Sequence, residues 1–174
     1  MMDEPMTQLP MTGGCQCGAI RYQVRSTPEA TYICHCRMCQ KSVGGPFAGY
    51  AMVAAATFMW TRGSPDEWAS SSLGLRQFCA TCGSPLGYRY VDGPERAKQY
   101  LTTGSFDDFQ TVVPLEQTGT ESRARWMDHL AEIPVRDLGA TMSPGQLDKL
   151  VNYQHPDHDT GSGWTSPVGA NARK

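Results

Sequence analysis

Alternating apolar and polar positions along the chain predict several short β-strands. In "GAIRYQV" (18–24) every second residue is apolar, with Arg21 and Gln23 on the other side, which is typical of a strand with one buried face. Segments bounded by Gly- and Pro-rich turns predict the other strands: one or two at 46–60, a strand, tight turn and strand at 75–91, and one at 98–106. The residues between the first two of these segments, 64–74, predict a loop.

Helical signals occur only toward the C-terminus. Residues 121–134 predict a short helix or an irregular segment. A helix over 144–153 is expected to start at Ser143, with Pro144 at its first position and Gln146 completing a capping box. The residues that follow are polar and rich in Gly and Pro, so they predict a poorly packed tail.

Length and composition indicate one mainly β domain. Of the 174 residues, 40% are hydrophobic, which is enough to bury a core. The counts of Gly 18 and Pro 12 suit a turn-rich β protein better than a helical bundle. The predicted units are a flexible leader at 1–12, the main domain at 13–140, and a C-terminal helix and tail at 141–174.

Charge and hydropathy argue against several kinds of partner. The formal net charge is −2 without a basic run, so nucleic acid is not expected as a partner. No apolar stretch is long enough to span a membrane. The N-terminal "MMDEPMTQLP" lacks the apolar region of a signal peptide, so we expect a cytoplasmic protein with reduced thiols.

The seven cysteines fall into groups of two, three and two: Cys15 and Cys17, then Cys34, Cys36 and Cys39, then Cys79 and Cys82. Cysteines so close in sequence are poorly placed to pair in disulfides with each other. They are well placed to hold one metal ion. The spacing therefore predicts metal binding rather than a disulfide framework.

The first and last groups share a pattern, "CQCG" and "CATCG", each beside a predicted strand. A metal-binding turn aims backbone N–H groups at the thiolates, and the residue after it often needs positive φ. Gly18 and Gly83 meet that need, whereas Gln40, after the middle group, does not. We therefore predict one tetrahedral zinc site on the four outer cysteines, whose binding energy contributes to folding.

The middle group is then three thiolates in one short loop. Three protein ligands with an open fourth position form the pattern of a catalytic zinc, where a substrate or water completes the site. Alternatively, a histidine closes it as a structural site, the candidates being His35, His129, His155 and His158. Within "CHC", His35 is expected to point away from the ion held by its neighbours; it is then either a catalytic group or an exposed histidine.

Four motifs occur in order along the chain: "GGCQCGAIRY" (13–22), "CHCRMC" (34–39), "FCATCGSPL" (78–86) and "TGSFDD" (103–108). A tryptophan follows in "SRARWMDHL". Together they resemble the glutathione-dependent formaldehyde-activating (GFA) enzymes and their relatives, which include centromere protein V. The resemblance covers roughly residues 11–136 and includes all seven cysteines.

The resemblance implies several short, coiled antiparallel β-sheets built from two similar zinc-binding halves. It also implies two Zn²⁺ ions per chain, one structural and one catalytic. The four outer cysteines match the ligands of the structural zinc. The three middle residues match the ligands of a catalytic zinc: Cys34, Cys36 and Cys39. The segment after residue 140 lies beyond the resemblance.

The activity that the resemblance implies is that of a carbon–sulfur lyase, which combines glutathione or a similar small thiol with formaldehyde or another small aldehyde. The forming alkoxide needs a proton donor, and His35, Tyr50 and bound water are candidates. Arg37 and Lys41 are either basic contacts for the carboxylates of glutathione or solvated surface charges. The alternative function is a non-enzymatic zinc module that binds a protein partner, as the centromere relative suggests.

Overall fold

The computed structural model describes residues 8–143 and 145–165. Its strands are β1 (Met11–Gly14), β2 (Arg21–Val24), β3 (Ala30–Cys34), β4 (Ala48–Ala54), β5 (Phe58–Arg62), β6 (Asp66–Ala69), β7 (Gly74–Phe78), β8 (Pro85–Tyr90), β9 (Lys98–Thr102) and β10 (Glu116–Thr118). The described α-helix is α1 (Arg37–Val43). The 3-10 turns are Ala55–Thr57, Pro94–Ala97, Thr103–Ser105, Phe109–Thr111, Thr120–Ser122, Arg125–Glu132, Gly139–Thr141, Leu147–Lys149 and Gly161–Gly163.

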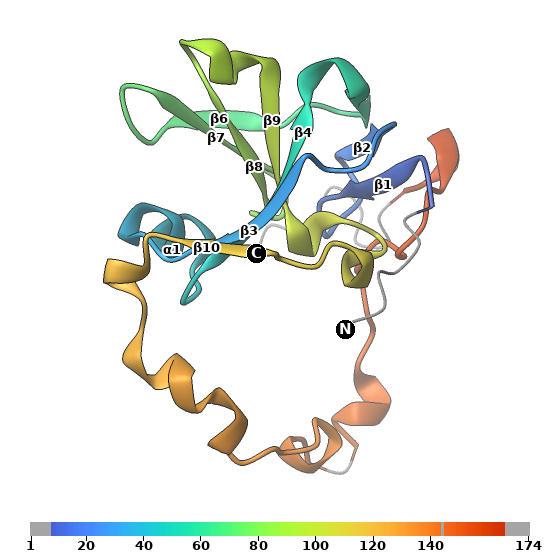
Figure 1. The fold of residues 1–174 in the computed structure, drawn as a ribbon. Helices are drawn as coiled ribbons and strands as arrows, with labels where there is room; N and C mark the ends of the chain where they lie inside the picture. The colour runs from blue at the N-terminus through green and yellow to red at the C-terminus, as the bar shows by residue number, and fades with distance from the viewer. Residues whose placement is uncertain (1–7, 144, 166–174) are drawn as a thin grey trace.

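Within the described residues, the strands form two sheets (Figure 1). The smaller has the order β1-β2-β5, and the larger has the order β10-β3-β4-β9-β8-β7-β6. The pairs are antiparallel except that β10 runs parallel to β3. The expected mainly β fold is therefore confirmed, with one parallel pair that the resemblance did not imply.

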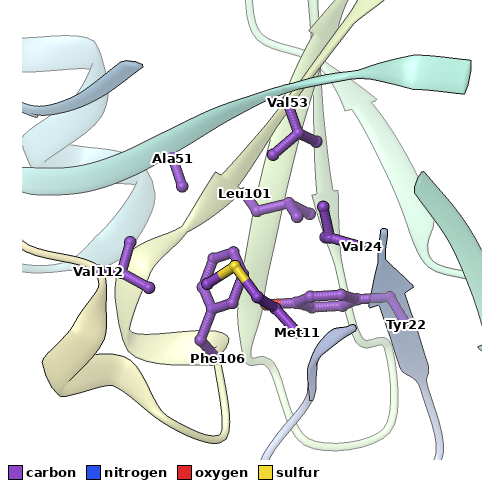
Figure 2. Close-up of a cluster of buried hydrophobic side chains, with 8 residues drawn as sticks. All are labelled: Met11, Tyr22, Val24, Ala51, Val53, Leu101, Phe106 and Val112. Atoms are coloured by element: carbon purple, nitrogen blue, oxygen red, sulfur yellow. The ribbon is translucent and has the colours of Figure 1, made fainter. Parts of the chain in front are cut away.

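A buried hydrophobic cluster joins the two sheets (Figure 2). The smaller sheet contributes residues from β1 and β2, and the larger sheet contributes residues from β4 and β9. The cluster consists of Met11, Tyr22, Val24, Ala51, Val53, Leu101, Phe106 and Val112. Tyr22 and Val24 are alternate positions of β2, and Ala51 and Val53 are alternate positions of β4, so burying them fixes which face of each strand is turned to the core.

Most strand predictions are confirmed. The segment 46–60 contains β4 and most of β5, the segment 75–91 contains most of β7 and all of β8, and the segment 98–106 contains β9. The predicted loop at 64–74 is wrong in part, because it contains β6. This strand has no buried residue, so the hydrophobic pattern gave no signal for it. The strand β1 likewise begins at Met11, within the expected leader.

The expected C-terminal α-helix is not what the described residues form. Pro144, its predicted first residue, lies outside them, and 145–153 contain a single 3-10 turn, Leu147–Lys149. The Ser143 N–H does donate to Gln146 Oε1 at 2.8 Å, so half of the capping box exists. However, Leu150 is 56% exposed, so the predicted apolar face has nothing to pack against.

After β10 the chain leaves the two sheets beside α1 and forms an arc that contains several 3-10 turns. It returns to the sheets beside β1 and β2 (Figure 1). We call residues 123–153 the arm. Its large apolar side chains, such as Trp126, Leu130 and Val135, are exposed. The 121–134 segment, predicted as a short helix or an irregular segment, contains 3-10 structure over Arg125–Glu132 that is interrupted by a kink at His129.

Candidate metal centres

Two similar turns, the second of them one residue longer between its cysteines, carry the four outer cysteines. In each, the N–H of the first cysteine donates to the carbonyl five residues further on, at 3.0 Å for Cys15 and 2.9 Å for Cys79. The glycine after the second cysteine has a φ of 73° at Gly18 and 78° at Gly83. The predicted positive φ at both glycines is therefore confirmed.

The four sulfur atoms of these turns fit one tetrahedral metal ion. All four lie within 4.8 Å of one another, with the Cys17 sulfur 3.6 Å from that of Cys15 and 3.9 Å from that of Cys79. A zinc ion with bonds of ~2.3 Å to four sulfurs places them about 3.8 Å apart. All seven cysteines are free, and a disulfide would need sulfurs about 2.05 Å apart.

The protonation of these thiols follows from their surroundings. Burial raises the pKa of Cys15 above its usual 9.0, despite a hydrogen bond from the Ile20 N–H to its sulfur at 3.2 Å. Burial also raises the pKa of Cys82, but hydrogen bonds with Ser84 and Cys17 outweigh it and lower that pKa to about 6. The turn thus favours a thiolate at Cys82, and a divalent cation would favour it at the others.

Residues 155–164, which we call the strap, pack on the first of these turns. The His155 N–H donates to the Gln16 carbonyl at 2.7 Å, and the Trp164 Nε1–H donates to the Cys17 carbonyl at 3.1 Å. The rings of His155 and Trp164 meet edge to face, with centroids 4.7 Å apart. His155 is only 3% exposed, so the prediction of a poorly packed tail is wrong for His155 and Trp164, whereas most residues between them are exposed.

A buried ion pair connects two of the sequence motifs. Arg21 was expected on the polar side of its strand, but it is 3% exposed because Asp107 pairs with its guanidinium, one bond being 2.9 Å from Nη1 to Oδ1. Next to it, the Tyr22 hydroxyl and Ser105 Oγ lie 2.8 Å apart. These two contacts therefore connect β2, which lies in the "GGCQCGAIRY" motif, with the "TGSFDD" turn after β9.

The three middle cysteines meet where β3 ends and α1 begins. Cys34 is the last residue of β3, Cys36 directly precedes α1, and Cys39 lies in its first turn. Their sulfur atoms lie within 4.8 Å of one another, and no other described His, Cys, Asp or Glu joins them within that range. This group can therefore hold a metal ion with three protein ligands.

No histidine closes the three-cysteine centre, although all four lie in the described ranges. His129 is exposed on the arm, His158 is exposed on the strap, and His155 packs on the Cys15–Cys17 turn without joining the four cysteines. His35 points away from the thiols, as expected, but it is not an exposed histidine. It is 0% exposed, and its Nε2 lies 2.9 Å from Gln117 Oε1 on β10.

The helix start favours a thiolate at one member of this group. Burial raises the pKa of Cys36, but hydrogen bonds from the Cys39 N–H, from both neighbouring thiols and from the Met38 N–H outweigh it, so the pKa is lowered. Burial raises the pKa of Cys34 to about 12. Of the Cys34 and Cys36 thiols, Cys36 is thus the more readily ionised.

Two residues that the sequence did not connect reach this centre. Arg76 on β7 donates from Nη2 to Cys39 Sγ at 3.5 Å and from Nη1 to the Tyr50 hydroxyl at 2.6 Å. Tyr50 was expected as a proton donor, whereas Arg76 was missed. The sequence clue to Arg76 was its position three residues before Cys79, because this places Arg76 on the predicted hairpin that carries part of the four-cysteine centre.

A pocket of 780 Å³ lies beside Tyr50 and Arg76. Lys41 on α1 and Asp66 and Trp68 on β6 also line it. Arg37, the other basic residue expected here, is absent from the described lining and donates instead to Gln40 Oε1. Of the two predicted basic contacts, the structure thus brings only Lys41 to this pocket.

The sequence model of the family described as "glutathione-dependent formaldehyde-activating enzyme" matches residues 10–122, which is more than half of the chain. The chain belongs to this GFA family. The matched range contains both cysteine centres, Tyr50, Arg76 and the "TGSFDD" motif. The arm and the strap lie outside it.

Two relatives carry names that agree with the GFA family. An uncharacterized lyase of Schizosaccharomyces pombe is 28% identical over 81 residues, which are 47% of this chain and 58% of that protein. A putative glutathione-dependent formaldehyde-activating enzyme of Halomonas elongata is 34% identical over 86 residues, which are 44% of this chain and 54% of that protein. The chain therefore spans little more than half the length of these relatives.

One solved structure has a similar fold. A crystal structure of a Rhodobacter sphaeroides protein matches 62% of this chain and 100% of its own, with a TM-score of 0.50 and 18% identity. At this identity the likeness concerns the fold alone. In the ranges 8–143 and 145–165, no helix has the length and apolar character needed to cross a membrane.

Proposed function

We propose that the protein is a zinc-dependent carbon–sulfur lyase that forms or cleaves an adduct of glutathione, or a similar thiol, with formaldehyde or another small aldehyde. The observation that carries this proposal is the three-cysteine centre, which has three thiol ligands and no fourth described one and lies next to a pocket. The family, the lyase name of the Schizosaccharomyces pombe relative and the formaldehyde-activating name of the Halomonas elongata relative support the same reaction class.

Zinc held by Cys34, Cys36 and Cys39 would leave one position for the substrate thiol and lower the pKa of that thiol. In the addition, a sulfur–carbon bond forms as the carbonyl π bond breaks. The thiol proton is released, and the carbonyl oxygen gains a proton, so atoms and charge balance. Cleavage is the reverse of the same step.

Tyr50 is the proton donor that we favour. Tyr50 lines the pocket, and its hydroxyl accepts a hydrogen bond from Arg76, so its oxygen is held in place as a proton donor. Burial and the nearby Cys39 raise the pKa of Tyr50, so the phenol stays protonated at neutral pH. His35 is fully buried, and its Nε2 is paired with Gln117, so it is less suited to this role.

The pocket suits a small peptide thiol. Its 780 Å³ volume falls in the range of about 300–1,000 Å³ that is usual for small-molecule sites. The exposed ammonium group of Lys41 at its edge is placed to attract a carboxylate, and Asp66 to attract an amino group. Glutathione carries both kinds of group. A cytoplasmic, reducing setting would keep the seven free cysteines available for zinc.

The decisive experiment measures exchange at equilibrium, because glutathione and formaldehyde also combine spontaneously. We expect zinc-loaded protein to accelerate NMR exchange between free glutathione and its hydroxymethyl adduct above the spontaneous rate. The acceleration should rise with pH and level off near neutrality, where zinc places the pKa of a bound ligand at about 7.

Two variants identify the source of this acceleration. Cys36→Ala should abolish it while leaving the protein folded, because the metal of this centre is lost. Tyr50→Phe should reduce it about 100-fold or more, the usual contribution of a general acid. Equal rates for the parent and Cys36→Ala would exclude the assignment, and no acceleration with any thiol and aldehyde would favour a binding module.

A further inference from the structure

The guanidinium group of Arg76 makes several contacts at the three-cysteine centre. In addition to its contacts with Cys39 Sγ and the Tyr50 hydroxyl, its Nε donates to Ser70 Oγ at 3.2 Å. Its guanidinium carbon lies 5.0 Å from the centroid of the Tyr88 ring, a distance at which a cation and an aromatic face attract each other. Each of the three guanidinium nitrogens thus has a defined partner.

This arrangement depends on the shape of a guanidinium. One planar group reaches a sulfur and a hydroxyl oxygen through two different nitrogens while a third nitrogen is held from behind. A lysine ammonium is a point charge on a flexible chain and cannot hold this fork. The side chain therefore fixes the Cys39 sulfur relative to the Tyr50 hydroxyl.

Charge gives Arg76 a second effect. A divalent metal with three thiolates has a net charge of −1, and a substrate thiolate would make it −2. Arg76 brings a positive charge to the three thiols through its contact with Cys39 Sγ. The side chain is half-buried, so solvent screens its charge less than it would at the surface. A fixed positive charge at this place favours the entry of a further anion.

We propose that Arg76 is a positioning residue that orients Cys39 and Tyr50 and offsets the negative charge of the three-cysteine centre, so that a thiol can join it as a thiolate. The thiol gives its proton to solvent on binding. This inference rests on the proposed function in one respect only, namely that a metal at this centre accepts a thiol. It does not require turnover.

Cobalt(II) provides a readout that is independent of activity, because thiolate-to-cobalt charge-transfer bands report the electron density on sulfur. The variants are Arg76→Gln, which loses charge and fork, and Arg76→Lys, which keeps the charge. The matched control is Arg25→Gln, because Arg25 lies just after β2, is exposed, and donates from Nε to Gln23 Oε1 rather than to a cysteine. The spectrum of Cys36→Ala gives the background of the four-cysteine centre.

We expect both Arg76 variants to shift the charge-transfer band of the three-cysteine centre, since both lose the hydrogen bond to sulfur. At fixed pH, glutathione should bind at least about tenfold more weakly to Arg76→Gln, the usual effect of removing a residue that supports a ligand. Arg76→Lys should retain most of this affinity. Arg25→Gln should leave the band and the affinity unchanged.

An unshifted band and unchanged glutathione affinity in Arg76→Lys and Arg76→Gln would overturn the inference. If Arg76→Gln does not fold, Arg76→Lys decides through the band alone. If the parent binds glutathione at cobalt but does not accelerate exchange in the zinc form, the proposed function fails while the role of Arg76 stands. Parent protein whose spectrum does not respond to glutathione would remove the anion-binding part of the inference.

Discussion

Gly18 and Gly83 have the same left-handed backbone conformation in the two outer cysteine turns, but their surroundings differ. A Cβ at Gly18 would lie 2.3 Å from His155 Cδ2 and 2.5 Å from Trp164 Nε1. A Cβ at Gly83 would meet nothing within 4 Å. The first glycine is thus needed for its conformation and for the close approach of the strap, and the second for its conformation alone.

This pair gives a prediction with an internal control. Gly83→Ala should lower the free energy of unfolding of the zinc-loaded protein by about 1–2 kcal/mol, the cost of a left-handed non-glycine residue. Gly18→Ala should cost about 1–2 kcal/mol more, because the strap moves and loses hydrogen bonds worth ~1 kcal/mol each. Urea unfolding measures both values.

The strap is tested directly by repeating the comparison in a background that carries both His155→Ala and Trp164→Ala. There the excess cost of Gly18→Ala over Gly83→Ala should largely disappear, because both side chains that a Cβ at Gly18 would meet are gone. An excess that persists unchanged would mean that the strap does not rest on this turn in solution.

At the residue scale, the sequence predicted what depends on local geometry. The cysteine groups and the positive φ of their glycines follow from spacing within a few residues. The burial of His35 and the contacts of Arg76 could not be predicted in this way. Gln117 lies 82 residues from His35, and Tyr50 lies 26 residues from Arg76, so only the folded chain brings these pairs together.

The strand β6 shows how an element without buried residues is held in place. Glu67 on this strand accepts hydrogen bonds from Arg89 on β8, at 2.7 and 2.8 Å, and from Gln77 on β7 at 2.9 Å. The hydrogen bond and charge of Arg89 lower the pKa of Glu67 below its usual 4.5. Because β6 lines the pocket, this contact also shapes the candidate substrate site.

Glu67→Gln should lower the free energy of unfolding at pH 7 by at most about 1 kcal/mol, because the side chains of Arg89 and Glu67 are 40% and 30% exposed to solvent. A lowered folded-state pKa stabilises the protein above the unfolded-state pKa, and this stability is lost only as pH falls through the folded value. The difference between parent and variant should therefore stay constant from pH 7 to 5.5. A difference that shrinks over this range would mean that the pKa of Glu67 is raised instead.

Several strands with a buried face could be predicted from the sequence, whereas strands with only exposed residues could not. Alternation indicated β2, and segments bounded by turns indicated β4 and β9, but β6 and β10 have only exposed residues. The strand β3 was also missed, although Thr31 and Cys34 on it are buried. The C-terminal helix was predicted from a capping box, but a cap contributes only about 1 kcal/mol. Without a surface to cover Leu147, Leu150 and Val151, the described residues form a 3-10 turn instead.

On the scale of the whole molecule, the two cysteine centres have different structural roles. The four-cysteine centre joins segments more than 60 residues apart, since Cys17 and Cys79 are separated by 62 positions. The three-cysteine centre draws on residues 34–39 alone. A metal ion at the first would therefore stabilise the fold, whereas one at the second would add little to the stability.

Protein prepared with zinc under reducing conditions should bind two equivalents of zinc. A mild chelator should remove one equivalent first, from the three-cysteine centre, without loss of the fold, as followed by metal analysis and circular dichroism. Cys36→Ala should bind one equivalent and melt within a few degrees of the parent. Cys79→Ala should lose several kcal/mol and give insoluble protein. Simultaneous release of both ions, or the reverse order of the two variants, would contradict this division.

The arm is attached to the body at its two ends, and each end lies at a different cysteine centre. Before the arm, the Ser122 carbonyl accepts a hydrogen bond from Gln40 Nε2 at 3.0 Å, and after it His155 is fixed on Gln16. The cost of closing such a loop grows only with the logarithm of its length, by about 0.6 kcal/mol for each doubling. During evolution the arm can therefore lengthen, shorten or change its sequence at little cost, provided that the two anchors are kept. The family match ends at residue 122, where this freedom begins.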